Sequence, residues 1–458
     1  KDTLNLPQTD FPMRGGLTES EPVRLARWDE SKLYERIQQA RKDASAPRYI
    51  LHDGPPFANG DVHMGTALNK LLKDLVLKSK SMAGFETPYI PGWDCHGLPI
   101  EFKVVQQAQG LEPAEVRRRC EEFARKFIDI QRNSFRRLGV LGDWDNPYLT
   151  LDPAYEADII RVFATCVEKG LVYASKKPVQ WSYGAHTALA EAEVDYKEVT
   201  DTAVFVKFPL KDGPLAGESS LVIWTTTPWT LPANLAIALH ERFTYVRGTF
   251  VGEGGRREDL VVAKELLDQF GEKTGFHLEG EGSELKGAEL DGSVAQHPLL
   301  DRDSKVITAE FVTTETGTGA VHIAPGHGGD DYNAGMAHGL DVLSPVDDNG
   351  KYTDEVGLPD LVGTHVFAAN GEIVEMLDDG GHLIGREEYQ HSYPHCWRSK
   401  TPIIFRAVPQ FFIKIDAFRE AALAEIDRVD WLPPRNRNRI YGTVEARPDW
   451  CISRQRTW

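Results

Sequence analysis

The chain has 458 residues, of which 52 are Lys or Arg and 69 are Asp or Glu, giving a formal net charge of −17. Its hydrophobic fraction of 41% and charged fraction of 26% are typical of a folded globular protein and exclude a disordered or fibrous one. No run approaches the roughly 18 apolar residues that a membrane-spanning helix needs. Five scattered cysteines favour a reducing compartment, the cytoplasm, over a disulfide framework. The acidic balance argues against indiscriminate nucleic-acid binding, because phosphate affinity comes from Lys and Arg.

The first 150 residues alternate between predicted strands and helices. Strands are predicted at 48–51 and 87–90, and a helix at 66–82 with Thr66 as its N-cap. Its apolar side chains follow the helical period, with most of its lysines on the other side, and are Leu68, Leu71, Leu72, Leu75 and Val76. A second, strongly basic helix is predicted at 113–138. Strand, glycine-rich turn, helix and strand in this order indicate a parallel α/β sheet of the nucleotide-binding type.

The composition changes after about residue 185, where short alternating runs indicate a β-rich module. Strands are predicted at 203–208, 244–251 and 306–312, and a glycine-rich turn at 252–255. From about residue 391 the sequence changes again, to a segment rich in Pro, Arg and aromatic residues.

A turn rich in glycine and proline at 54–60 precedes His63, at the start of the first predicted helix. A helix N-terminus presents unpaired N–H groups and the positive end of the helix dipole, so it favours phosphate. A histidine placed just before it can donate to a phosphate oxygen as charge develops. The alternative is a tight turn before a capped helix, and these residues alone favour neither interpretation.

A second motif, at 91–101, follows the next predicted strand and contains Asp94. Parallel sheets bind ligands beyond the carboxyl ends of their strands, so Asp94 could hold a ligand ammonium group there. The alternative is a loop aspartate that caps the following helix.

Residues 52–69 and then 91–101 resemble the N-terminal half of class I aminoacyl-tRNA synthetases, with His63-Met64-Gly65-Thr66 at the family's HIGH signature. Within the class, 92–99 is similar to the isoleucine-specific members. The resemblance continues in the family's order to 449–458. It implies an α/β fold: the first half of a Rossmann-like catalytic domain at 1–184, a large inserted β-rich editing domain at 185–390, and a return toward the second catalytic half at 391–458.

The resemblance also implies a reaction and residue roles. Gly54 and Pro55 match the turn that shapes the isoleucine side-chain pocket, and Asp94 matches the residue that pairs with the substrate amino group. His63 matches the histidine that helps to position ATP, and Asn59 belongs to the same loop. The reaction implied is activation of isoleucine by ATP with Mg²⁺, followed by transfer to tRNA(Ile), by a monomer.

A threonine run at 225–227, a histidine at 322 and an acidic pair at 330–331 form the third constellation. Together they could make a polar pocket that binds an amino ester and orients water, although threonine runs are most often ordinary strand residues. The resemblance assigns them to hydrolytic editing of mischarged Val-tRNA(Ile). The residues that match that site are Thr225, Thr226, Thr227, Asn234, His322 and Asp331. Isoleucine and valine are the standard example of substrates too alike for one binding site to separate.

The sequence departs from the family pattern in three places. Thr66 stands where the signature has its second histidine, which makes it a weaker catalytic candidate than His63. Ser182 and Ala185 replace the Cys-x-x-Cys zinc knuckle of many members, and Cys396 with His395 makes only two ligands, so we predict no zinc. No Lys-Met-Ser-Lys-Ser signature is present, so we expect half of the activation site and the whole editing site.

RNA contact is predicted at two groups of basic side chains, because local stripes can bind phosphate even when the chain is acidic. The alternative for each arginine is a solvated charged face. The residues are Arg117, Arg118, Arg119, Arg132, Arg136 and Arg137 in the basic helix, and Arg435, Arg437, Arg439 and Arg447 near the end.

Overall fold

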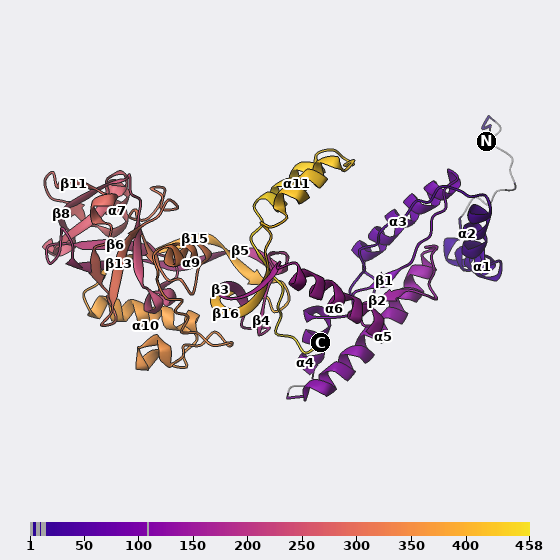
Figure 1. Ribbon diagram of the computed structural model, residues 1–458, viewed down its shortest axis with the longest axis horizontal. Helices are drawn as coiled ribbons and strands as arrows, with labels where there is room; N and C mark the ends of the chain where they lie inside the picture. The colour runs from indigo at the N-terminus through magenta and orange to yellow at the C-terminus, as the bar shows by residue number, and fades with distance from the viewer. Residues whose placement is uncertain (1–2, 6–9, 11–14, 108–109) are drawn as a thin grey trace. The chain divides into compact units, whose positions relative to one another are not determined.

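The computed structural model describes residues 3–5, 10, 15–107 and 110–458. The chain divides into two compact units. The first unit comprises the chain up to Thr165 together with Arg456–Trp458, and the second unit comprises Cys166–Gln455. The fold is α/β, as predicted, with parallel strand pairing in the first unit and a β-rich second unit (Figure 1).

The first unit is mainly helical around a short parallel sheet. Its elements are α1 (Leu17–Glu30), α2 (Leu33–Asp43), α3 (Met64–Met82), β1 (Gly92–Trp93), α4 (Leu98–Gln107), α5 (Pro113–Arg137), β2 (Tyr148–Leu149) and α6 (Pro153–Glu168), whose last turn passes into the second unit. β1 pairs with β2 in parallel. Parallel bridges also join Arg48 to Glu86 and Phe57 to Asp94. The segment 86–94 therefore lies between the segment 48–57 and strand β2. The predicted parallel arrangement is therefore confirmed.

The predicted strands at 48–51 and 87–90 do not form as regular strands. The first is reduced to the Arg48 bridge, and the second is irregular. Pro88 and Pro91 lie in and beside the second segment and cannot donate to a ladder, which explains why pairing there is broken. The Tyr89 N–H instead donates to the Tyr34 hydroxyl at 2.9 Å.

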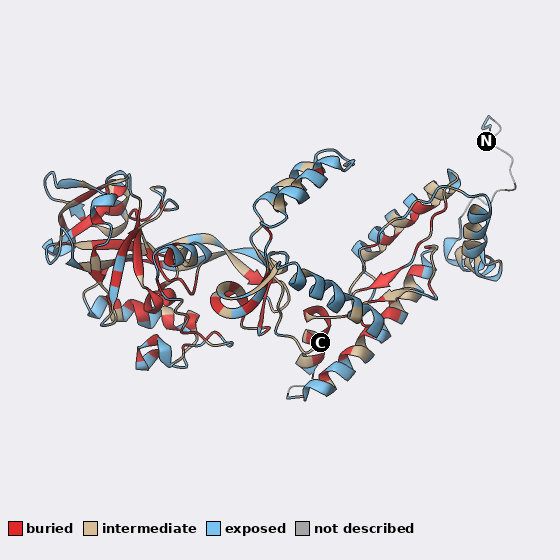
Figure 2. Ribbon diagram, viewed as in Figure 1, coloured by how far each residue is buried: buried red, intermediate tan, exposed pale blue. Residues whose placement is uncertain are grey.

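Helix α3 buries the face opposite to Leu68, Leu72 and Leu75. Lys70, Asp74 and Leu77 are its buried residues, and Lys70 is only 2% exposed. Leu72 is 54% exposed and Leu75 63%, so the apolar stripe found in the sequence faces away from the core of the first unit (Figure 2). Lys70 faces inward instead and pairs with the buried Asp53 carboxylate. The helix begins at Met64, and its N-cap is His63, so the prediction of Thr66 as N-cap is wrong.

The second unit is built on β-sheets. Its strands are β3 (Val172–Ser182), β4 (Thr187–Ala188), β5 (Val194–Asp212), β6 (Ser220–Thr225), β7 (Ala236–Leu239), β8 (Thr244–Val251), β9 (Arg257–Ala263), β10 (His277–Leu278), β11 (Ser283–Lys286), β12 (Val294–Gln296), β13 (Asp303–Thr308), β14 (Ala320–Ile323), β15 (Leu383–Cys396), β16 (Ile404–Ile413) and β17 (Trp450–Cys451). Its helices are α7 (Leu267–Thr274), α8 (Gly287–Leu290), α9 (Gly329–Ala337), α10 (Val366–Asp379), α11 (Arg419–Arg428) and α12 (Asn436–Glu445).

The larger sheet of the second unit runs in the order β10-β8-β9-β6-β5-β12-β13-β7-β14, with β11 added beside β8 and β15 beside β5. A smaller sheet has the order β17-β16-β3-β4. The prediction of a strand at 244–251 is confirmed by β8, and 203–208 lies inside β5. The strand predicted at 306–312 ends at Thr308, because the chain turns there and Phe311 is solvent-exposed.

The core of the second unit is closed and apolar. The inward residues of β5, β6, β7 and β13 are almost wholly buried, as the red strands in Figure 2 show. Helix α10 adds Val366, Ala369, Ile373 and Leu377 to the same cluster. Among the residues that the structure describes, we find no helix with the length and apolarity needed to cross a bilayer.

Candidate functional site

His63 caps the N-terminus of α3 with its own side chain. Its Nδ1 accepts from the backbone N–H groups of Gly65, at 3.1 Å, and Thr66, at 3.3 Å. Nδ1 therefore carries no proton, and the ring proton on Nε2 donates to the Thr66 hydroxyl at 3.0 Å. The imidazole thus covers amides that an anion at this helix end would use. It must turn aside before a phosphate can bind them.

Gly65 and Gly54, near this helix end, differ in the space around them. A Cβ at Gly65 would lie 3.1 Å from the His63 ring, so glycine lets the imidazole fold over the helix. A Cβ at Gly54 would meet no protein atom within 4 Å, and its φ is not in the left-handed region. Space beside Gly54 is therefore open to a ligand.

Behind the 54–60 turn lies a buried polar network. Asp53 is 3% exposed and accepts from the Lys70 and Lys73 ammonium groups and, at 2.7 Å, from the Tyr89 hydroxyl. Burial would raise the pKa of Asp53, but Lys70 next to it holds that pKa below its ordinary value. Sequence reasoning missed this network, because nothing in the spacing distinguishes Lys70 from the other lysines of α3. It anchors the start of the turn.

Asp94 lies beside the same turn. Its N–H donates to the Pro56 carbonyl at 2.9 Å, and its carbonyl accepts from Ala58 at 3.0 Å. The structure thus brings Asp94 next to the turn that contains Gly54 and Pro55. Burial raises the pKa of the Asp94 carboxyl, which His96 partly offsets. A cation arriving at this carboxylate would be favoured, because it would relieve that cost.

Asn59 holds the far end of the turn in place. Its side-chain amide donates to the Pro99 carbonyl at 3.2 Å, and its own carbonyl accepts from Lys103. Gln131 of α5 donates to the carbonyls of Phe57, at 3.0 Å, and Gly60, at 2.7 Å. Gln131 is buried and was not identified from the sequence.

The last residues of the chain return to the first unit at 95–101. The Trp458 indole donates to the Cys95 carbonyl at 2.7 Å, and Gly97 donates to the Trp458 carbonyl at 3.1 Å. The buried Glu101 carboxylate accepts from the N–H groups of Thr457 and Trp458, at 3.0 and 2.9 Å. Glu101 is a second positioning residue that sequence reasoning missed.

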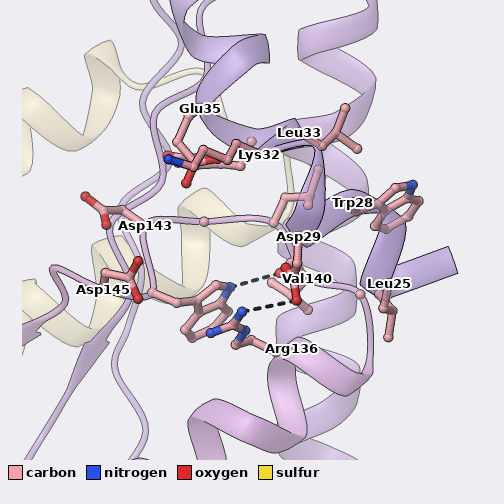
Figure 3. A pocket seen from close by; sticks show the side chains of 15 residues that line it. Leu25, Trp28, Asp29, Lys32, Leu33, Glu35, Arg136, Val140, Asp143 and Asp145 are labelled. Atoms are coloured by element: carbon pink, nitrogen blue, oxygen red, sulfur yellow. Dashed lines mark hydrogen bonds and ion pairs between the residues drawn. The ribbon is translucent and has the colours of Figure 1, made fainter. Parts of the chain in front are cut away.

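A cavity of about 240 Å³ in the first unit contains none of these side chains (Figure 3). It lies between the α1–α2 junction and the loop after α5, and Arg136 donates to Asp29 within it at 3.2 Å. Glu35, Asp143 and Asp145 add carboxylates to its lining. None of the predicted site residues therefore lines this cavity.

In the second unit, the threonine run and His322 are joined by hydrogen bonds. Thr225 and Thr227 share a hydroxyl contact of 3.2 Å at the end of β6. Thr230 donates to the Thr227 carbonyl at 2.8 Å, which uses its only hydroxyl proton. Its oxygen must then accept from His322 Nε2 at 2.9 Å. Thr230 is the connecting residue that the prediction omitted.

The tautomer of His322 follows from this chain of bonds. With its proton on Nε2, Nδ1 is a bare acceptor, and among the described residues it has no hydrogen-bond partner. His322 is 8% exposed, and burial lowers its pKa to about 4, with His327 contributing. The ring is therefore neutral near pH 7, its Nδ1 is buried without a partner, and it cannot supply positive charge.

Asp331 lies in the first turn of α9, against the end of the strand that carries His322. Its carboxylate accepts from the backbone of Ala324, and a Cβ at Gly328 would overlap it. Burial, with the neighbouring Asp330, raises the pKa of Asp331 to about 7. Such a carboxyl is suited to bind an ammonium group, which would restore its ionisation.

The remaining predicted residues of this site differ in position. Asn234 is fully buried, donates to the Ala236 carbonyl at 2.8 Å and accepts from Ser304 at 2.7 Å. Both ends of its amide are therefore used by the scaffold. Thr226 is partly exposed between the bonded pair Thr225 and Thr227.

The arginines of α5 are largely paired with carboxylates. Arg118, Arg119, Arg125 and Arg132 bond Glu or Asp one turn away, at 2.5–2.9 Å, and Arg136 and Arg137 reach Asp29 and Glu21. Arg117 donates to the Thr457 carbonyl at 3.0 Å. Near the end, Arg437 pairs with Asp427 and Arg447 with Glu191, whereas Arg435 and Arg439 are exposed. The predicted basic stripe on α5 is therefore mostly neutralised.

The family model for tRNA synthetases class I (I, L, M and V) matches residues 23–458. The chain belongs to this family. The synthetase chain is 52% identical, over its whole length, to an isoleucine–tRNA ligase of Methylacidiphilum infernorum (isolate V4), covering 50% of that protein. It is 50% identical, again over its whole length, to an isoleucine–tRNA ligase of Desulfitobacterium hafniense (strain DSM 10664 / DCB-2), covering 49% of that protein. The chain thus spans about half the length of these curated relatives.

Among solved structures, the synthetase chain matches the ternary complex of Agrobacterium radiobacter K84 agnB2 LeuRS with tRNA and LeuAMS. The match covers 85% of this chain and 49% of that chain, at 17% identity and a TM-score of 0.35. A score this low carries no argument about the site.

Proposed function

We propose that the full-length protein is an isoleucine–tRNA ligase that activates isoleucine with ATP, transfers it to tRNA(Ile) and hydrolyses Val-tRNA(Ile). The observation that carries the proposal is the likeness to isoleucine–tRNA ligases along the whole chain, at 50–52% identity for the two relatives above. This chain holds the His63 half of the activation site, and the half with the Lys-Met-Ser-Lys-Ser signature belongs to the rest of the protein.

In activation, an isoleucine carboxylate oxygen attacks the α-phosphorus of ATP, and the bond to the leaving pyrophosphate breaks. The chain's part is to position and to stabilise charge rather than to supply a nucleophile. The N-terminus of α3 offers amides for phosphate once His63 turns aside, and Thr66 adds a hydroxyl. Asp94 binds the substrate ammonium beside the open space at Gly54 and Pro55, while Asn59 holds the turn. Mg²⁺ accompanies ATP.

The test is amino-acid-dependent exchange of pyrophosphate into ATP by the full-length protein. We expect exchange with isoleucine and weaker exchange with valine. Exchange that depends on a different amino acid would overturn the assignment. Asp94→Asn should raise the KM for isoleucine more than that for ATP, because it removes the charge that pairs with the ammonium group.

In editing, water attacks the ester carbonyl of Val-tRNA(Ile), releasing valine and a free ribose hydroxyl on the tRNA. We assign the ammonium of the valyl group to Asp331, and we place the buried His322 behind the threonine run, to which Thr230 links it. Thr225, Thr226 and Thr227 line the site, and Asn234 supports it from the scaffold. Asp331→Ala should abolish deacylation of Val-tRNA(Ile) while leaving isoleucine activation unchanged. Undiminished deacylation by this variant would refute the editing assignment.

The proposal extends to the protein's organisation. We assign residues 1–184 to the first half of a Rossmann-like catalytic domain, 185–390 to the editing domain and 391–458 to the return toward the second half. We also propose that the protein is cytoplasmic and that it is a monomer. Sedimentation of the full-length protein would test whether it is a monomer. We also propose that this chain requires no zinc.

A further inference from the structure

Two short loops of the second unit meet through their side chains. One follows β3 and runs from Ser182 to His186, and the other follows β15 and runs from Cys396 to Lys400. The fifth residue of each loop is a non-glycine residue with left-handed φ, 52° at His186 and 61° at Lys400. Each loop also folds back on its first residue, with Ala185 N–H to Ser182 O at 3.3 Å and Lys400 N–H to Cys396 O at 2.9 Å.

The first and fourth residues of the two loops are Ser182 with Ala185, and Cys396 with Ser399. This is the spacing at which paired Cys-x-x-Cys loops hold a structural metal. Ser182 and Cys396 are fully buried, and Ala185 is 2% exposed. Three of the four equivalent positions thus lie in the interior, and Ser399 is partly buried.

Hydroxyl groups join the loops. The Ser182 and Ser399 hydroxyls lie 3.2 Å apart, and Ser399 also contacts the Thr401 hydroxyl at 2.8 Å. Ser182 Oγ accepts from the Ala185 N–H at 3.1 Å. A Cβ at Gly184 would lie 2.8 Å from Thr401 Oγ1, so the close approach of the loops needs glycine there.

The donor set does not fit zinc. Of the four equivalent positions only Cys396 offers a sulfur, and zinc in structural sites takes four Cys or His ligands. His395 precedes Cys396 on β15, so the two side chains point to opposite faces and cannot share one ion. Among the described residues, no group of three potential ligands comes together.

We propose that Ser182, Ala185, Cys396 and Ser399 stand at the four ligand positions of a paired-loop metal scaffold in which a hydrogen-bonded hydroxyl cluster has replaced the metal. The cluster performs the metal's mechanical task, which is to tie the end of β3 to the loop between β15 and β16. It does so without four thiolates and without a need for metal supply.

The test restores the ligands. With Zn–S bonds of about 2.3 Å, tetrahedral sulfurs lie about 3.8 Å apart, which is close to the present separation of the hydroxyls. The 458-residue chain carrying Ser182→Cys, Ala185→Cys and Ser399→Cys should bind about one Zn²⁺ or Co²⁺ per chain. The Co²⁺ form should show thiolate charge-transfer absorption and the visible bands of a tetrahedral site.

Two controls make the result decisive. The same three substitutions with Cys396→Ser should lose most of the affinity and the four-sulfur spectrum, and the unaltered chain should bind no zinc at this place. A triple variant that keeps the native circular dichroism but binds no Co²⁺ would overturn the scaffold. Stoichiometric zinc in the unaltered chain would overturn the replacement.

A second measurement does not depend on the triple variant folding. Ser182→Ala and Ser399→Ala should each lower the unfolding temperature of the second unit by a few degrees. Together they should lower it by less than the sum, because both remove the same contact. Strict additivity of the two shifts would show that the hydroxyls do not act as one cluster.

Discussion

The two units differ in whether charged side chains lie in their interiors. The second unit closes an apolar core around its larger sheet, in which Phe208 and Ile223 are wholly buried. The first unit places a charged pair, Asp53 with Lys70, in its interior and leaves Leu72 and Leu75 of α3 in solvent. Helix α6 has no buried residue at all (Figure 2). The second unit is therefore stabilised mainly by its own apolar contacts, whereas the first combines an apolar cluster around Trp93, Phe135 and Trp144 with a buried charged pair.

The largest effect should come from the apolar core. Phe208→Ala should cost the second unit about 3–5 kcal/mol, because a buried ring leaves a cavity. Hydrogen exchange measured segment by segment would show protection lost in β5 and β6 but retained in α5. Equal loss of protection in both units would show that they unfold together, which would contradict separate stabilisation of the two units.

Breaking the buried pair should be nearly as costly. Lys70→Ala leaves the Asp53 carboxylate buried with less compensation, at about 3 kcal/mol or more. The loss should be confined to the first unit in the same exchange experiment. Lys42→Ala, at an exposed position of α2, is the matched control and should change stability by less than about 0.5 kcal/mol. A Lys70→Ala chain as stable as this control would mean that the pair adds nothing.

A pH-dependent effect should follow from Asp331. Its pKa is raised to about 7 in the folded chain, so the folded state holds the proton more tightly than the unfolded state. The stability of the second unit should fall as pH rises from about 4 to about 7. Asp331→Asn should match the original chain at pH 4 and exceed it at pH 8 by roughly 2–4 kcal/mol. Urea unfolding at both pH values measures this, and a constant difference would contradict the shift.

Loss of the cap on α3 should have a smaller effect. His63→Ala removes the acceptor for two helix amides and should cost about 1 kcal/mol. It also frees those amides, so weak binding of inorganic phosphate or pyrophosphate to the chain should become stronger. His63→Asn, which can still cap, is the control for stability. Phosphate binding that weakens in His63→Ala would mean that the imidazole holds the anion rather than competing with it.

The smallest effect should be at the exposed leucines. Leu75→Gln should change the stability of the 458-residue chain by less than about 0.5 kcal/mol, since the side chain is 63% exposed. Leu77→Gln, two residues away and buried, should cost several times more. Equal costs would show that the leucine face of α3 is covered in solution.

Much of the fold was predictable from local pattern. Residues 244–251 form β8 as expected, and 113–138 corresponds to α5, because alternation and helical periodicity act over a few residues. The prediction of a strand at 87–90 was wrong because the alternation of side chains takes no account of Pro88 and Pro91, which cannot donate to a sheet. Leu68, Leu72 and Leu75 of α3 point outward, because amphipathicity shows that a helix has two faces but not which one lies against the buried Asp53 carboxylate.

The sequence by itself determined which residues are candidates. Recognisable local motifs contain the turn at 54–60, Asp94, the threonine run, His322 and Asp331. Only the tertiary structure decided their states. It placed His63 over the amides of its own helix, left His322 Nδ1 without a partner and raised the pKa of Asp331 to about 7. Proton positions and pKa values depend on burial and on contacts between distant segments, such as Thr230 with His322, and no local pattern contains that information.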